Sequence, residues 1–157
     1  MATDVDALRT VADYQFGSGA GRALFDGDIV VQRTSSGRPQ QILADDGRLV
    51  SYGTDGRFTL GATGGFRLQA ALEPPAYRVV VGDDSEPFVR DGKNVFAKFV
   101  RSVDRDVRPG DEVLVEHVDG ALLAVGRAEL SADAMAEFDT GMAVKVRDGI
   151  EADTERL

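Results

Sequence analysis

The consecutive prolines Pro74 and Pro75 restrict the fold of this chain more than any other feature of its sequence. Each has a fixed φ and lacks a backbone N–H, and the pair stands between an apolar stretch and a new strand-like pattern. We therefore expect the 157 residues to form two small domains, 1–72 and 73–150, followed by an acidic tail, 151–157. The first 72 residues hold seven basic and eight acidic side chains, against 11 and 19 in the remainder, so the two parts present different surfaces to solvent.

Residues 1–72 have the pattern of a small α+β domain. Val5, Leu8 and Val11 recur at helical spacing, which predicts an amphipathic helix near the N-terminus. Strand-like segments follow, separated by the turn-forming pairs Ser36-Gly37 and Asp46-Gly47. The expected elements after the helix are a glycine-rich loop at 17–21, strands at 29–33, 39–44 and 48–52, and a second helix at 64–72.

Residues 73–150 carry many short strand-like segments and two short helical ones, which is typical of a small β-barrel. Pro109-Gly110-Asp111 and Asp119-Gly120 predict turns, and Ser131 is the expected N-cap of a helix. The expected strands are 77–81, 95–100, 112–117, 122–129 and 143–147, and the expected helical segments are 83–91 and 131–138. The predicted fold class is α+β: a small α+β N-terminal domain followed by a β pseudo-barrel with short helices.

The residue types that most catalytic and cofactor sites use are scarce in this chain. It has no cysteine, which excludes thiolate metal sites and iron–sulfur clusters, and one histidine, His117. We therefore expect no catalytic residue, no cofactor and no metal. The net charge is -9 and lysine is rare among the basic residues, which predicts a halophilic archaeal source. No apolar run approaches the roughly 20 residues of a membrane span, and the N-terminus lacks a signal pattern, so we expect a cytoplasmic protein.

Five sequence blocks of the second half resemble one known family. They are Glu86-Pro87-Phe88-Val89, the segment 92–100 (GKNVFAKFV), and the segments 108–113, 123–128 and 141–147. In this order they resemble the PUA domain, an RNA-binding module, in the version found in archaeal tRNA-guanine (archaeosine) transglycosylase. The segments 12–17, 23–25 and 36–38 are similar to the domain that precedes PUA in that enzyme. The chain is too short for the enzyme's catalytic barrel, so the resemblance implies the RNA-holding end alone.

The segment 90–101 is the strongest candidate for RNA contact, because it carries four basic and one acidic side chain within an acidic protein. Ammonium groups contact phosphates, a glycine lets a backbone come close, and an amide hydrogen-bonds to base or ribose. The alternative is a strand edge protected by charge, and the resemblance favours RNA. The candidate RNA-binding residues are Arg90, Gly92, Lys93, Asn94, Lys98 and Arg101, with Lys145 and Arg147 on one face of the last strand.

Other residues carry weaker signals. Arg22 and Arg38, each beside a glycine, are candidates for a second contact with RNA or protein, with ordinary exposed arginines as the alternative. Phe96 and Phe99 have the chemistry to stack on bases, but their odd spacing predicts opposite faces of a strand, so we expect at least one in the core. His117 is expected to be structural. Solvated acidic turns are expected at Asp83-Asp84 and at Asp104 and Asp106.

Together these observations predict a non-catalytic RNA-binding protein. The resemblance implies binding to tRNA at its acceptor stem and 3′ end, as an accessory to a tRNA modification such as archaeosine formation, with a separate catalytic subunit as a further partner. No membrane partner is expected. The alternative is a protein-interaction or ribosome-associated subunit that uses a PUA fold without RNA contact, which the acidity of the second half favours.

Overall fold

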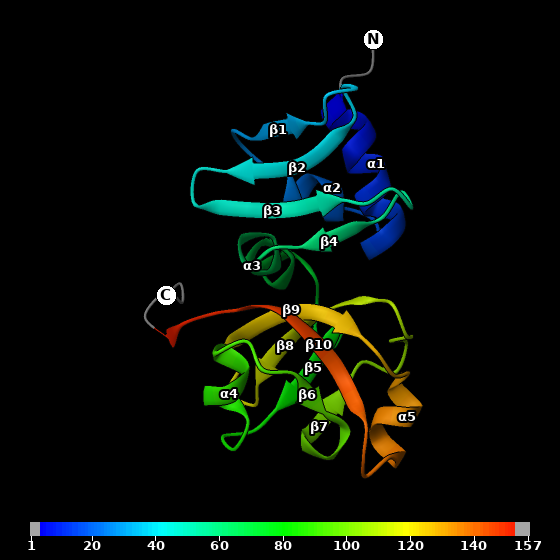
Figure 1. The fold of residues 1–157 in the computed structure, drawn as a ribbon, viewed down its shortest axis with the longest axis vertical. Coiled ribbons are helices and arrows are strands. Elements are labelled where there is room, and N and C mark those ends of the chain that lie inside the picture. The colour runs from blue at the N-terminus through cyan, green and yellow to red at the C-terminus, as the bar shows by residue number, and fades with distance from the viewer. Residues whose placement is uncertain (1–3, 153–157) are drawn as a thin grey trace. The chain divides into compact units, whose positions relative to one another are not determined.

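The computed structural model describes residues 4–152, which form two compact units, Met1–Leu72 and Glu73–Leu157 (Figure 1). Residues 153–157 of the predicted acidic tail lie outside the described part of the chain. Within residues 4–152, no helix combines the length and apolarity needed to cross a membrane.

In the first unit, helices come before and after an antiparallel meander. The strands are hydrogen-bonded in chain order, β1-β2-β3-β4, because short turns connect each strand to the next. The elements are α1 (Asp4–Phe16), α2 (Ala20–Leu24), β1 (Val30–Arg33), β2 (Pro39–Ala44), β3 (Gly47–Tyr52), β4 (Phe58–Leu60) and α3 (Ala62–Ala71).

Close contacts join the helices of this unit to its sheet. The ring centroid of Phe25, which follows α2, lies 5.7 Å from that of Phe58 in β4, in an edge-on arrangement. The Gln15 side chain donates to the Phe58 carbonyl and accepts from its N–H, at 2.8 and 2.7 Å. Gly64 lets α3 approach β3, because a Cβ there would lie 2.0 Å from the Leu49 carbonyl oxygen.

The second unit is built around one mixed sheet. Within residues 73–152 the strand order is β6-β10-β9-β8-β5-β7, with β5 and β8 parallel and the other neighbours antiparallel. The elements are β5 (Arg78–Val81), α4 (Glu86–Arg90), β6 (Val95–Phe96), the 3-10 helix η1 (Ala97–Phe99), β7 (Val100–Val103), β8 (Glu112–His117), β9 (Leu122–Ala128), α5 (Ala132–Glu137) and β10 (Met142–Gly149).

The sheet of the second unit curls into a nearly closed barrel. Its terminal strands, β6 and β7, are joined in sequence by the three residues of η1, so the connection brings the two edges of the sheet together. The inner side chains are mostly small and β-branched, among them Val79, Val113, Val115 and Val144. These features confirm the predicted α+β class with a β pseudo-barrel in the second half.

Several local predictions are confirmed and others are wrong. Ser131 caps α5, because its hydroxyl accepts the Ala134 N–H at 3.1 Å. The predicted continuous strand 95–100 is wrong, since η1 interrupts it and buries Ala97. The predicted glycine-rich loop at 17–21 is shorter than expected, because α2 begins at Ala20.

Candidate functional site

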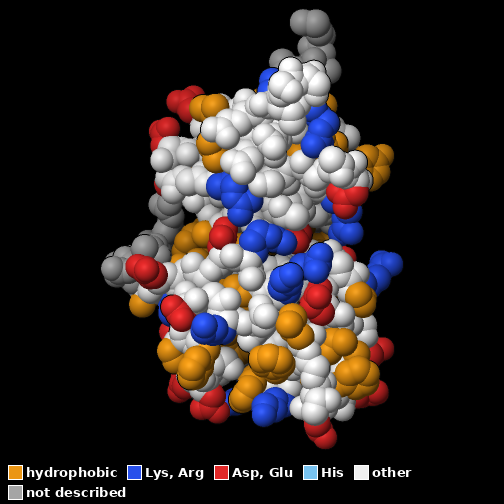
Figure 2. All heavy atoms as spheres, in the orientation of Figure 1, with side chains coloured by type: hydrophobic (Ala, Val, Ile, Leu, Met, Phe, Trp, Pro, Cys, Tyr) orange, Lys and Arg blue, Asp and Glu red, His pale blue; other side chains and the backbone are white. Residues whose placement is uncertain are grey.

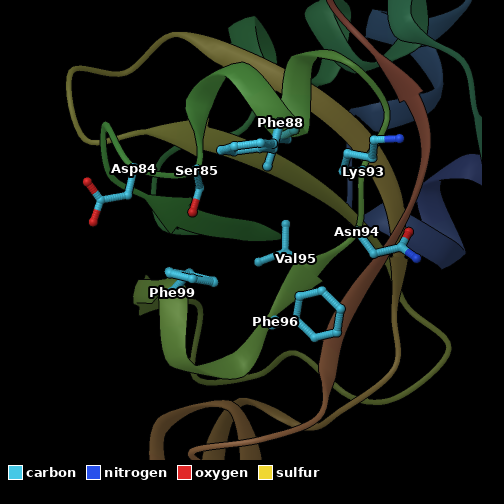
Figure 3. A pocket seen from close by; sticks show the side chains of 9 residues that line it. Asp84, Ser85, Phe88, Lys93, Asn94, Val95, Phe96 and Phe99 are labelled. Carbon is cyan, nitrogen blue, oxygen red and sulfur yellow. The ribbon is translucent and has the colours of Figure 1, made fainter.

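The most distinctive hollow of the second unit is apolar and has a volume of about 370 Å³. Figure 3 shows Phe88, Phe96 and Phe99 arranged around Val95, from three different elements. We call this hollow the aromatic pocket. Its lining residues are Asp84, Ser85, Phe88, Val89, Lys93, Asn94, Val95, Phe96 and Phe99.

The three phenylalanines of the aromatic pocket are exposed to solvent. Phe88, Phe96 and Phe99 are 61%, 46% and 39% exposed, and Figure 2 shows hydrophobic side chains gathered in the lower part of the view, where α4, β6 and α5 lie in Figure 1. The prediction that Phe96 or Phe99 lies in the core is therefore wrong. The 3-10 helix breaks the alternation of a strand, and Ala97 takes the buried position.

A helix cap positions the polar rim of the pocket. The Lys93 N–H donates to the Phe88 carbonyl and the Gly92 N–H to the Val89 carbonyl, at 2.9 and 3.0 Å. Gly92 has φ +92°, so this pattern is a Schellman motif, which requires a left-handed residue at that position. Gly92 thus ends α4 and directs the chain so that Lys93 lines the pocket.

Of the two lysines in the segment 90–101, Lys93 lines the aromatic pocket, and Lys98 lies against one of the pocket's rings without lining it. Lys93 is exposed and lines it, and the ammonium of exposed Lys98 lies 5.1 Å from the ring centroid of Phe99. The exposed carboxylate of Asp84 is also at the rim, so the cationic edge is not continuous. The pocket therefore combines three aromatic rings with the Lys93 side chain, and the Lys98 ammonium lies beside Phe99.

Other candidates from this segment have contacts within the protein. Arg90 donates from Nε to Glu86 and from an Nη to the Ile150 carbonyl, both at 2.9 Å. Asn94 Oδ1 accepts the Val146 N–H at 3.0 Å, next to the register shift between Val146 and Asp148 in the β10–β9 pairing. The Arg101 guanidinium packs against Gly82, where an added Cβ would lie 2.8 Å from it. These contacts hold the three side chains against the second unit.

A second hollow, of about 280 Å³, is lined by Arg127, Lys145, Val146 and Arg147. Lys145 in β10 stands directly opposite Arg127 in β9. Two of these cations have carboxylate partners: Arg127 contacts Glu129 at 2.9 Å, and Arg147 makes a two-pronged contact with buried Glu112. The hydrogen bond to Glu129 raises the pKa of Arg127 above its ordinary value.

The two arginines singled out in the first half have different surroundings. Arg22 is exposed on α2 and lines an open hollow together with Arg67. Arg38 donates to the Gly53 carbonyl at 3.3 Å, and its guanidinium lies 5.9 Å from the ring centroid of Tyr52.

His117 is buried at the end of β8 and hydrogen-bonded, as expected. Its Nε2 lies 2.6 Å from Asp83 Oδ1, and Nδ1 accepts the Asp119 N–H at 3.1 Å. The pKa of His117 is raised, and the hydrogen bond to Asp83 makes the largest contribution. Burial lowers this pKa, whereas the hydrogen bond to Asp119 and the charges of Asp119 and Glu86 raise it. The pKa of Asp119 is lowered, chiefly by the N–H of Ala121. Sequence reasoning paired Asp83 with Asp84, whereas the structure places Asp83 against His117.

Sequence reasoning also missed Phe88 as a candidate site residue. A phenylalanine in a short helix of a small domain is usually a core residue, and here it is the most exposed of the three in the pocket. The available signal was its place in a block shared with the PUA family, four residues before Gly92.

Comparison with known families assigns both halves of the chain. Residues 77–150 match the PUA domain, and residues 6–75 match the patch-forming domain C2 of tRNA-guanine transglycosylase. The chain is therefore a PUA-domain protein with a mixed α/β fold.

Individual relatives make the assignment more specific. The chain is 48% identical over 145 residues to the tRNA-guanine(15) transglycosylase of Thermococcus kodakarensis, covering 92% of this chain and 25% of that protein. It is 45% identical over 148 residues to the tRNA-guanine(15) transglycosylase of Methanothermobacter thermautotrophicus, covering 93% and 23%. The chain thus pairs the C2 and PUA domains as in the C-terminal part of these transglycosylases, and spans about a quarter of their length. The matched stretch does not include the catalytic barrel.

A solved structure shares both units. A hypothetical protein from Pyrococcus horikoshii aligns with a TM-score of 0.71 and 25% identity over 93% of this chain and 89% of that one. The resemblance stated from the sequence blocks is confirmed. The predicted halophilic source and cytoplasmic location stay predictions.

Proposed function

We propose that this chain binds RNA through the aromatic pocket and acts in tRNA modification without performing the chemistry itself. The observation that carries the proposal is that Phe88, Phe96 and Phe99 expose their rings around one hollow, with Lys93 and Lys98 beside them. Exposed aromatic faces stack on unpaired bases, and ammonium groups contact the phosphates between them. The relationship to tRNA-guanine(15) transglycosylases supports tRNA as the RNA.

The finer proposal is that the pocket takes the unpaired 3′ end of tRNA, next to the acceptor stem. An unpaired strand offers bases that are already separated from a helix, so stacking on Phe96 or Phe99 requires no melting of base pairs. Lys145 and the exposed Arg127 form a second cationic region for the backbone, and Arg22 and Arg38 remain candidates for contacts in the first domain. Archaeosine formation, with a separate catalytic subunit, is the proposed setting.

The first test separates stacking from general surface effects. Replacing Phe96 by alanine removes an exposed ring from the pocket, and loss of one stacked base weakens binding by about 1–3 kcal/mol, roughly 5- to 150-fold. Phe138→Ala is the matched control, because Phe138 is similarly exposed but does not line the pocket. Binding of a tRNA transcript is measured by fluorescence anisotropy, and thermal unfolding confirms that both variants fold.

A shortened RNA tests the finer proposal. A transcript without its unpaired 3′ nucleotides is expected to bind the parent protein as weakly as the full transcript binds Phe96→Ala. Equal binding of both transcripts would overturn the 3′-end assignment while leaving RNA binding intact. Absence of tRNA binding by the parent, or equal losses in Phe96→Ala and Phe138→Ala, would overturn the proposed site. Partners that remain in a pull-down after ribonuclease treatment would then favour a protein-interaction role.

A further inference from the structure

A second group of side chains in the PUA unit has the chemistry of a metal site. Asp83, Glu86 and His117 each offer one ligand atom, and these atoms all lie within 4.8 Å of one another. His117 Nε2 lies 2.6 Å from Asp83 Oδ1 and 3.9 Å from Glu86 Oε1. The fold produces this arrangement, because β5 and β8 are parallel neighbours and Val81 is paired with His117. The loop that follows β5 therefore passes beside the end of β8.

The imidazole is oriented from its other side. The His117 side chain is only 9% exposed, and its Nδ1 lies 3.1 Å from a carboxylate oxygen of Asp119. Metal-bound histidines usually donate the second ring N–H to a carboxylate or carbonyl, which fixes the ring and increases its basicity as a ligand. Asp119 is in place to accept such a proton. This orientation of a nearly buried ring is independent of the two carboxylates that face Nε2.

The two carboxylates differ in how firmly they are held. Glu86 Oε2 contacts Arg90 Nε at 2.9 Å, which leaves Oε1 on the side of His117. The Asp83 side chain is 89% exposed, so it has room to move and water has access to the site. Zinc with ligand distances of about 2.1 Å in a tetrahedral site separates its ligand atoms by about 3.4 Å. Shifts of less than about 1 Å, mostly in Asp83, bring the shortest contact to that spacing.

We propose that Asp83, Glu86 and His117 bind a divalent cation of the zinc class, with water as the fourth ligand. One imidazole and two carboxylates suit Zn²⁺, whereas Ca²⁺ takes six to eight oxygen ligands and Mg²⁺ prefers oxygen in an octahedral arrangement. The bound ion joins the β5–α4 loop and the first turn of α4 to the end of β8. It thereby fixes the helix that carries Phe88.

Zinc binding requires a proton to change place on the imidazole. When the ring is neutral and Nδ1 accepts the Asp119 N–H, the proton is on Nε2 and is directed at Asp83. An ion bound at Nε2 displaces that proton. The ring then carries its proton on Nδ1, and this N–H forms a hydrogen bond to the Asp119 carboxylate. The tautomer of His117 is therefore a direct spectroscopic indicator of where the ion binds.

The test is a titration of the full chain with ZnCl₂ by isothermal calorimetry in metal-free buffer. One site per chain is expected, with at least about tenfold weaker binding for Asp83→Asn, because second ligand-sphere changes alone typically cost 10–100-fold. Asp84→Asn is the matched control: it is the neighbouring exposed carboxylate and does not belong to the group. In ¹⁵N-edited NMR spectra, zinc is expected to convert His117 to the Nδ1–H tautomer.

Three results would overturn the proposal. They are the absence of zinc binding at millimolar concentration, equal affinities of Asp83→Asn and Asp84→Asn, and an unchanged His117 tautomer at saturating zinc. Binding of Ca²⁺ or Mg²⁺ as tight as that of Zn²⁺ would overturn the assignment to the zinc class. Because Asp83 is almost fully exposed, its variant is expected to fold and the comparison does not depend on His117→Gln.

Discussion

Replacing Arg147 by alanine is expected to destabilise the PUA unit, although this residue is a sequence candidate for RNA contact. The Arg147 guanidinium donates to both carboxylate oxygens of Glu112, at 2.5 and 2.9 Å. The Glu112 side chain is only 3% exposed. Arg147→Ala therefore leaves a buried carboxylate without its main charge partner, and the effect should appear in folding before it appears in RNA binding.

The size of the effect follows from the burial of the two partners. Removing one member of a buried ion pair costs about 3–5 kcal/mol. The Arg147 side chain is 28% exposed, so water partly replaces it and the lower end of that range, about 3 kcal/mol, applies. For a domain of this size, each kcal/mol lowers the melting temperature by about 4–8 °C, so Tm should fall by roughly 12 °C or more.

Differential scanning calorimetry of the parent, Arg147→Ala and Lys145→Ala measures this effect. Lys145 is exposed and lies two residues away on the same strand, so its replacement should change the free energy of unfolding by less than about 0.5 kcal/mol. Adding Glu112→Gln to Arg147→Ala should restore part of the loss, because a neutral amide costs less to bury than a carboxylate that has lost the Arg147 guanidinium. A loss below about 1 kcal/mol in Arg147→Ala would place the contact among ordinary surface ion pairs and refute the reasoning.

Three further outcomes are expected. The double variant Lys93→Ala/Lys98→Ala should reduce the slope of log affinity for tRNA against log salt concentration by about 1.4, because each lost contact with single-stranded RNA contributes about 0.7. An unchanged slope would show that neither lysine contacts a phosphate. The pKa of His117 is raised in the folded state, so the stabilisation that its protonation provides is complete below pH ~6.5 and is lost as the pH rises through the folded pKa. In urea unfolding with EDTA present, the difference in the free energy of unfolding between the parent and His117→Gln should therefore become smaller above that pH. A difference that does not change with pH would contradict the raised pKa of His117 in the folded state. Gly64→Ala should lower the free energy of unfolding of the first unit by more than the roughly 1–3 kcal/mol of ordinary overpacking, because its Cβ would clash with the Leu49 carbonyl oxygen. Near-native stability in urea unfolding would show that α3 can move away from β3.

Features that depend on residues close together in the chain could be predicted from the amino-acid sequence alone. Gly37, Gly110 and Gly120, which stand in the predicted turns, all adopt positive φ, because a tight turn requires a backbone that glycine adopts without strain. Ser131 caps α5 because its hydroxyl reaches an N–H three residues ahead. The PUA blocks and the α+β class also followed from the sequence, since order and spacing along the chain are enough to recognise them.

Contacts between side chains that are far apart in the chain depend on the packing of the fold and could not be predicted from local patterns. A helix cap and strand β6 lie between Phe88 and Phe99 in the chain, and the exposure of Phe99 depends on where the 3-10 helix η1 interrupts the strand. Arg147 meets Glu112 across 35 residues, and His117 meets Asp83 across 34. Alternation along one strand says which side chains share a face, but the order and register of the other strands decide which charge or ring stands opposite. That information lies in the packing of the whole barrel, which no local pattern contains.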